Sequence, residues 1–182
     1  MGPSSREQAA IQSESLKLTI RNLLVRKGFL LVYAKDAEAL PCSYGTVLFP
    51  NCVGVFSRAR PAFPSIHGTN FKSMFMLHRP SWATPVGLEC HGQTKNGSAD
   101  QKLEYLYANI MEQSAYPFLV ILDGPAFRAG VITRGREMEK RSAGKITLMT
   151  SFRDLERWEA EGDCFPYPKW SLPSRSLFGV RN

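Results

Sequence analysis

The chain has 182 residues, 43% of them hydrophobic, and a net charge of +7. A chain of this length fits one domain with an adequate core, and its hydrophobic content argues against wholesale disorder. Its 23 Lys and Arg exceed its 16 Asp and Glu, which favours a polyanionic partner such as nucleic acid, although a merely basic protein has the same composition. No run approaches the roughly 18 apolar residues of a membrane span, so no membrane segment is expected.

The four cysteines are widely and unevenly spaced, with no C-x-x-C pair among them. They are Cys42, Cys52, Cys90 and Cys164. Reduced thiols are the simplest interpretation of such a pattern, because neither a disulfide framework nor a zinc-ligand spacing is present. The N-terminus also lacks the apolar region of a signal peptide. Both features predict a cytoplasmic protein.

The N-terminal part predicts a polar, flexible segment and then a helix. Residues 1–12 are polar, and Ser13 is a suitable N-cap for the helix that follows. Apolar residues then recur at helical spacing, and basic residues fill the other positions. The apolar set is Leu16, Ile20, Leu23 and Leu24. Gly28 is suited to ending this helix.

The next part predicts strands. Phe29–Tyr33 is a short apolar run, whereas prolines and glycines break the apolar pattern between residues 41 and 68. Phe71–His78 is predicted as one strand that returns through a Pro-containing loop to Val86. The two strands on either side of this loop would form an antiparallel hairpin.

The stretch from residue 86 to residue 103 organises the rest of the chain. Side chains alternate between the two faces of a strand, so Glu89, His91 and Gln93 would share one face. The other face would carry Leu88, Cys90 and Gly92. One face of this strand therefore gathers groups that can bind a metal or position a water molecule.

A helix is predicted directly after this strand. Asn96–Gly97 is a turn signal, and Ser98 with Gln101 three residues later matches a capping box. The apolar residues that follow recur on one side of the helix. They are Leu103, Leu106, Ile110 and Met111. This side is expected to face the core.

The C-terminal half predicts two strands and a final helix. Pro117–Leu122 is a continuous apolar run typical of a strand buried on both faces. Residues 128–141 are interpreted as a solvated loop or short helix, and Ile146–Met149 as a further strand. Ser151 begins the last helix, with Asp154 three residues later. The tail, residues 163–182, mixes proline, aromatic and basic residues that could contact nucleic acid or pack over the domain.

Residues 87–105 resemble a motif of the PD-(D/E)XK nuclease superfamily. Their sequence is Gly-Leu-Glu-Cys-His-Gly-Gln-Thr-Lys-Asn-Gly-Ser-Ala-Asp-Gln-Lys-Leu-Glu-Tyr, similar to the family's Glu-x-Lys strand followed by a Gly-Ser-Ala-Asp-x-Lys-x-x-Tyr helix start. The resemblance covers roughly residues 13–160, with motif-level detail in 71–130. It implies an α/β, restriction-endonuclease-like fold, in which helices flank a mixed central sheet, for a domain at residues 13–162 between the flexible N-terminus and the tail.

The resemblance also implies a function. It predicts a divalent-metal-dependent DNA endonuclease that hydrolyses phosphodiester bonds, uses Mg²⁺ (or Mn²⁺), and acts as a homodimer or with a partner subunit. The implied catalytic residues are Glu89, His91 and Gln93, with Glu89 also the metal ligand. The implied nucleic-acid contacts are Lys95, Ser98 and Lys102. Hard divalent ions prefer oxygen ligands, which suits the carboxylate of Glu89.

Two departures from the family pattern leave an alternative open. His91 stands where the family has Lys, and Met74 stands where it has a metal-binding acid on the preceding strand. A thioether is a poor ligand for a hard cation. The alternative is therefore a catalytically impaired, nuclease-like module that binds DNA or a partner. A zinc site at Cys90 and His91 is a more distant third interpretation, because no further ligands lie at suitable spacing.

Overall fold

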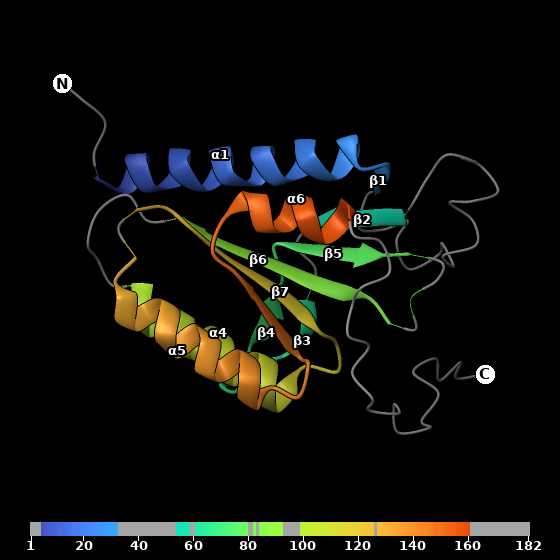
Figure 1. Cartoon of the computed structure of the whole chain (residues 1–182). Coiled ribbons are helices and arrows are strands. Elements are labelled where there is room, and N and C mark those ends of the chain that lie inside the picture. Colours follow the sequence, from blue (N-terminus) through green and yellow to red (C-terminus); the bar gives the residue numbers. More distant parts are fainter. Residues whose placement is uncertain are drawn as a thin grey trace, which may run out of the picture.

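The computed structural model describes residues 5–32, 54–58, 61–79, 82, 84–92, 99–125 and 127–160. Within these ranges, six strands form one mixed sheet and two form a small antiparallel sheet (Figure 1). The large sheet has the order β1 (Phe29–Val32), β2 (Gly54–Arg58), β5 (Phe75–His78), β6 (Val86–Gly92), β7 (Phe118–Asp123) and β8 (Ile146–Met149). The small sheet pairs β3 (Pro61–Pro64) with β4 (Asn70–Lys72).

The strand directions divide the large sheet into two parts. β5 is antiparallel to both β2 and β6. On one side β1 is parallel to β2, and on the other β6, β7 and β8 are parallel to one another. The predicted hairpin of β5 and β6 is confirmed, as is the central, fully buried strand β7. The carboxyl ends of β6 and β7 lie at the same edge of the sheet.

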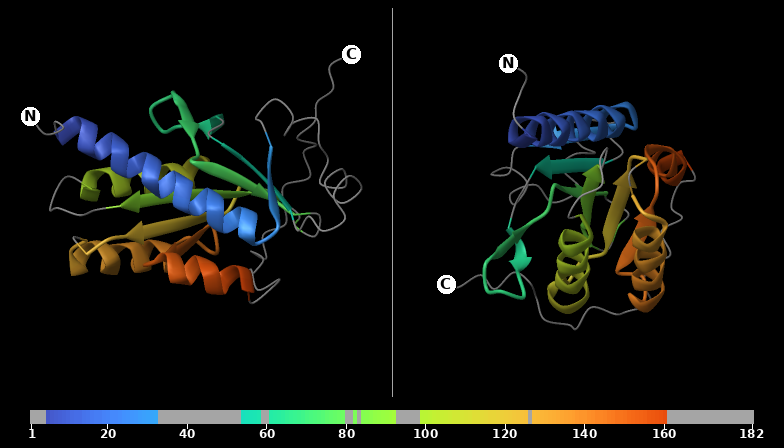
Figure 2. Two further views of the ribbon diagram at one scale, coloured as in Figure 1. Left: turned by 90° about the horizontal axis from the view of Figure 1, so that it is seen from above. Right: turned by 90° about the vertical axis from the view of Figure 1, so that its left-hand side faces the viewer.

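The helices cover both faces of the sheet (Figure 2). One face is covered by α1 (Ser5–Arg26) and α6 (Phe152–Ala160), and the other by α4 (Ala99–Gln113) and α5 (Ala129–Arg141). The predicted α/β fold with a mixed central sheet and flanking helices is therefore confirmed. Among the described residues, no helix combines the length and apolar content that a membrane span would require.

The core consists of two clusters separated by the sheet. The α1-side cluster contains Ile20, Leu23, Leu24, Phe29, Phe75, Leu77, Val86, Leu88, Cys90, Leu119, Ile121, Met149 and Leu155. The α4-side cluster contains Phe63, Leu103, Leu106, Tyr107, Ile110, Phe118, Val120, Leu122, Ile146 and Leu148. Alternate residues of β7 enter opposite clusters, which explains why this strand is apolar throughout.

Three sequence-based predictions need correction or refinement. The first helix begins at Ser5 rather than near Ser13, because no proline or glycine interrupts residues 5–12 and their side chains permit helix. Residues 129–141 form a regular helix, which decides between the loop and the short helix that the sequence left open. The single strand predicted at Phe71–His78 is two strands in different sheets, divided at Ser73 and Met74.

Two predicted helix boundaries are confirmed. Gly28 has a left-handed φ of 84° just after α1, a conformation that glycine adopts without strain. The Asp154 N–H donates to Ser151 Oγ at 3.3 Å, as a cap at the start of α6 requires. The proposed tail contacts at residues 163–182 lie outside the described residues.

Candidate active site

Strand β6 sends alternate side chains to opposite faces of the sheet, as its sequence predicts. Leu88 and Cys90 belong to the α1-side cluster. Glu89 lies opposite Val120 of β7 in the parallel register, and Val120 belongs to the α4-side cluster. In-register neighbours of a sheet point to the same face. Glu89 and His91 therefore both lie on the face covered by α4 and α5.

Glu89 is a buried carboxyl group whose pKa is strongly raised. Its side chain is 8% exposed, and its Oε1 accepts a 2.6 Å hydrogen bond from the Met74 N–H. Burial raises the pKa of Glu89 to about 7, while the Met74 N–H and the adjacent Ser73 side chain partly offset the rise. A carboxyl group with a pKa near neutrality can both hold and release a proton under physiological conditions.

The start of β5 provides no acid beside Glu89. Ser73 is fully buried, and its hydroxyl donates a 2.6 Å hydrogen bond to the Phe75 carbonyl. The Met74 side chain packs against the α1-side cluster, so only its backbone faces Glu89. The motif resemblance puts Met74 at the position where the family has its metal-binding acid. In the structure, Ser73 is the residue whose side chain reaches Glu89.

His91 is a neutral group in this structure. Burial, together with a smaller effect of the positive charge of Lys102, lowers the pKa of His91 to about 4. Its Nε2 atom is buried and has no hydrogen-bond partner among the described residues. His91 therefore cannot supply the positive charge of the family's lysine, but its unprotonated ring nitrogen can accept a proton or bind a water molecule.

The structure brings only part of the predicted site together. Glu89 and His91 lie on one strand face, and the exposed Lys102, from the first turns of α4, is close enough to His91 to affect its titration. Gln93, Lys95 and Ser98 lie outside the described residues. Helix α4 begins at Ala99, directly after the predicted cap at Ser98.

Asp123 is an acid near this edge that the sequence interpretation did not assign to the site. It lies opposite Gly92 in the register of β6 and β7, one residue out of phase with His91. Strand alternation therefore directs Asp123 to the same face as Cys90 rather than that of Glu89. Its charge helps to raise the pKa of the Cys90 thiol to about 12, after the larger effect of burial. This thiol is a poor metal ligand at neutral pH.

The described residues do not make a complete metal site. They contain no group of three or more His, Cys, Asp and Glu side chains that could hold an ion, and Glu89 is the single carboxylate found on its strand face. One buried carboxylate does not satisfy a hard divalent cation, which takes several oxygen ligands. The zinc interpretation is likewise unsupported here, because Cys90 and His91 point to opposite faces.

The comparison with known families agrees with the fold. A family model described as the PD-(D/E)XK nuclease superfamily domain matches residues 8–155. The chain belongs to the PD-(D/E)XK nuclease superfamily. This membership identifies a nuclease-type domain, and nucleases of this superfamily generally use divalent metal ions. No curated protein and no solved structure gives a significant match.

Proposed function

We propose that this PD-(D/E)XK domain is a DNA endonuclease that hydrolyses phosphodiester bonds in the presence of a divalent ion. The observation that carries the proposal is the buried carboxyl of Glu89 on β6, and the motif resemblance assigns this residue the metal-binding role of the family. Burying a carboxyl in a strand is costly unless it is fully hydrogen-bonded, paired or coordinated. The hydrogen bond from the Met74 N–H offsets only part of this cost, which favours a functional role for Glu89.

The proposed site requires a second acid that the described residues do not provide. A second carboxylate would have to come from a part of the chain that the structure does not describe or from another subunit. His91 and Gln93 are proposed to position the attacking water. Lys95, Ser98 and Lys102 are proposed to contact the phosphates of DNA, since the chain carries a net charge of +7.

Plasmid cleavage tests this function directly. Supercoiled DNA is incubated with the protein and Mg²⁺ or Mn²⁺, alongside Glu89→Gln protein and an EDTA control. We expect nicked or linear DNA only with a divalent ion and only with an intact Glu89. Glu112→Gln is a matched control, since Glu112 is an exposed carboxylate near the far end of α4, and it should retain full activity. Absence of cleavage with every divalent ion, at every sequence tested, would contradict the proposal.

The residues between β4 and β5, Ser73 and Met74, supply no acid to Glu89. This absence favours a second candidate function, a nuclease-like module that binds DNA without cleaving it. Met74 turns away from Glu89, Ser73 offers only a hydroxyl, and His91 stays uncharged. Gel-shift and anisotropy measurements separate this candidate from the enzyme. Salt-sensitive DNA binding that persists in Glu89→Gln, together with no cleavage by wild-type protein, would identify the non-catalytic module.

A further inference from the structure

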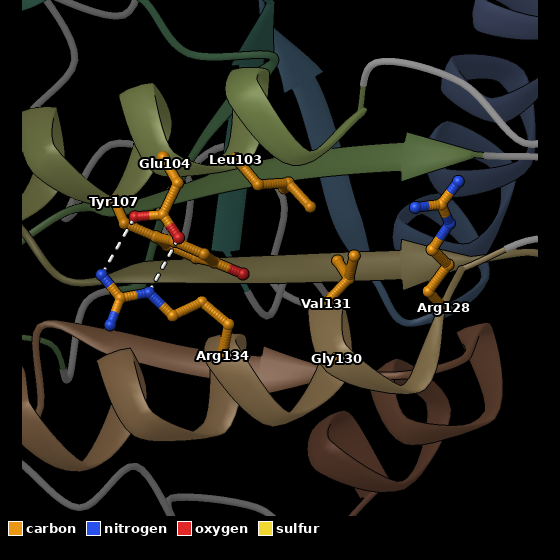
Figure 3. A pocket seen from close by; sticks show the side chains of 7 residues that line it. All are labelled: Leu103, Glu104, Tyr107, Arg128, Gly130, Val131 and Arg134. Atoms are coloured by element: carbon orange, nitrogen blue, oxygen red, sulfur yellow. Dashed lines mark hydrogen bonds and ion pairs between the residues drawn. The ribbon is translucent and has the colours of Figure 1, made fainter.

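A pocket of about 240 Å³ lies between helices α4 and α5, on the same face of the sheet as Glu89 (Figure 3). Its lining is Leu103, Glu104, Tyr107, Arg128, Gly130, Val131 and Arg134. Apolar side chains and an aromatic ring make most of its walls, while charged groups from both helices complete them. This combination suits a small ligand that has an apolar body and a polar end.

The hydroxyl of Tyr107 is the feature that points to a ligand. Tyr107 is 1% exposed, and its Oη has no hydrogen-bond partner among the residues that the structure describes. Figure 3 shows this hydroxyl directed into the space between α4 and α5. Burial raises the pKa of Tyr107 to about 12, so the group remains a hydrogen-bond donor. A buried donor left without a partner is costly, and a bound acceptor would remove that cost.

Two glycines of α5 leave the space that this arrangement needs. A Cβ at Gly135 would lie 2.9 Å from Tyr107 Oη and 2.8 Å from Leu148 Cδ2, so glycine permits the tyrosine to approach the helix. A Cβ at Gly130 would meet no atom within 4 Å. Gly130 therefore borders open space, and a larger residue there would fill it without disturbing the core.

The end of the pocket nearest the start of α5 is suited to an anion. Arg128 is the N-cap residue of α5, and its side chain makes no hydrogen bond to the first turn. Its carbonyl accepts hydrogen bonds from the Val131 and Ile132 N–H groups, so the N–H groups of residues 129 and 130 are the ones without an intrahelical acceptor. Arg128 is exposed and makes no ion pair with any described residue. Arg134, by contrast, is engaged by Glu104, with Nε–Oε1 and Nη2–Oε2 distances of 2.7 and 3.1 Å.

The topology connects this pocket with the candidate active site. Residues 124–128 lead from the carboxyl end of β7 to α5, and Asp123 at that end lies opposite Gly92 of β6. Arg128 therefore lies near the carboxyl ends of β6 and β7, the edge of the sheet that is nearest to His91. Ligands of α/β proteins bind outside the carboxyl ends of parallel strands.

We propose that the pocket between α4 and α5 binds one nucleotide unit. The base or sugar lies against Leu103, Tyr107 and Val131 and accepts a hydrogen bond from the Tyr107 hydroxyl. The phosphate lies at Arg128 and the first turn of α5. The inference rests on the proposed function in taking a DNA strand as the source of the nucleotide, whereas the pocket itself requires only the nucleotide's chemistry.

Calorimetric binding tests the pocket independently of cleavage. The full chain carrying Glu89→Gln is titrated in EDTA with dAMP, deoxyadenosine, inorganic phosphate and a short 5′-phosphorylated single strand. Tyr107→Phe should weaken dAMP binding about tenfold without loss of thermal stability, because it removes only an unpaired buried hydroxyl. Gly130→Leu should abolish binding. Arg128→Gln should weaken dAMP and phosphate but not deoxyadenosine, whereas Arg141→Gln, near the other end of α5, should change nothing.

The outcomes distinguish a DNA strand from a free nucleotide as the ligand. They also separate the pocket inference from the proposed endonuclease function. Tighter binding of the strand than of dAMP identifies a unit of DNA, and equal binding identifies a free nucleotide; both support the pocket. Binding that is unchanged by Tyr107→Phe and Gly130→Leu, or no binding of any probe, overturns it. Pocket-dependent binding without plasmid cleavage leaves this inference standing and removes the endonuclease. Plasmid cleavage without pocket-dependent binding supports the endonuclease and overturns this inference.

Discussion

The backbone N–H of Met74 donates a 2.6 Å hydrogen bond to Oε1 of Glu89. The bond joins the break before β5 to the candidate active-site strand β6. It is formed by the main chain, whereas the Met74 side chain packs on the opposite side of the sheet in the α1-side cluster. The environment of Glu89 thus depends on how the chain turns at Ser73 and Met74, which makes this turn the natural place to test the site.

The titration of Glu89 should make stability depend on pH. The carboxyl ionises near pH 4.5 when unfolded and near pH 7 when folded, so between these values the folded state holds a proton that the unfolded state has released. The free energy of unfolding contributed by Glu89 should therefore fall as pH rises through this window, by about 3 kcal/mol in total. Urea denaturation in EDTA measures it as the difference between wild-type and Glu89→Gln protein.

The comparison with Glu89→Gln is needed because His91 acts in the opposite direction over an overlapping range. A difference between the two proteins that does not change from pH 4 to pH 8 would contradict the raised pKa of Glu89. A difference that grows as pH rises above 7 would point to another ionising group, since both states of Glu89 are then ionised.

The position of Ser73 predicts where a second metal ligand can be introduced. Ser73→Asp would place a carboxylate beside Glu89, whereas Met74→Asp would place one in the α1-side cluster. Both variants should be less stable than wild type in EDTA, because each buries an added charge. Mn²⁺ should restore the thermal stability of Ser73→Asp alone, since only there do two carboxylates converge. Equal responses to Mn²⁺ would contradict this geometry.

His91 should remain uncharged throughout the physiological range. Burial and the Lys102 charge lower its pKa to about 4, so its ring proton signals in NMR should not titrate above about pH 5.5 and should shift only near pH 4. The signals are assigned by their loss in His91→Gln. Stability contributed by this group should be complete above pH 6.5 and should decline as pH falls towards 4. A midpoint near 6.5 would show that His91 is solvated.

Gly87 should be required for the packing of β6 against β7. A Cβ at this position would lie 2.2 Å from Cε1 of Phe118, in the fully buried α4-side cluster. Gly87→Ala should therefore reduce the free energy of unfolding by about 1–3 kcal/mol, measured by urea denaturation. Gly130→Ala is the matched control. Its Cβ meets open space within a helix, so it should stabilise by up to about 1 kcal/mol. Similar losses in both variants would contradict the contact.

The helices and most strands of this fold were predictable because each has a local signal. Three sequence patterns predict their elements through backbone geometry alone: the alternation in β6, the unbroken apolar run of β7 and the apolar side of α4. The start of α1 at Ser5 was missed, since polar residues before Ser13 permit helix without requiring it. The motif in residues 87–105 likewise indicated the family, which the match over residues 8–155 confirms, while the metal-binding role of Glu89 stays a prediction.

The sequence by itself determined the fold class, the family and the face of β6 that carries Glu89 and His91. Only the tertiary structure decided that Phe71–His78 is two strands, that Met74 points away from Glu89, and that Tyr107 has a buried hydroxyl facing a pocket. A one-residue irregularity in a strand reverses the face of every side chain beyond it, and local sequence does not reveal where that irregularity lies. The pKa values of Glu89 and His91 depend in the same way on burial by residues distant in the chain.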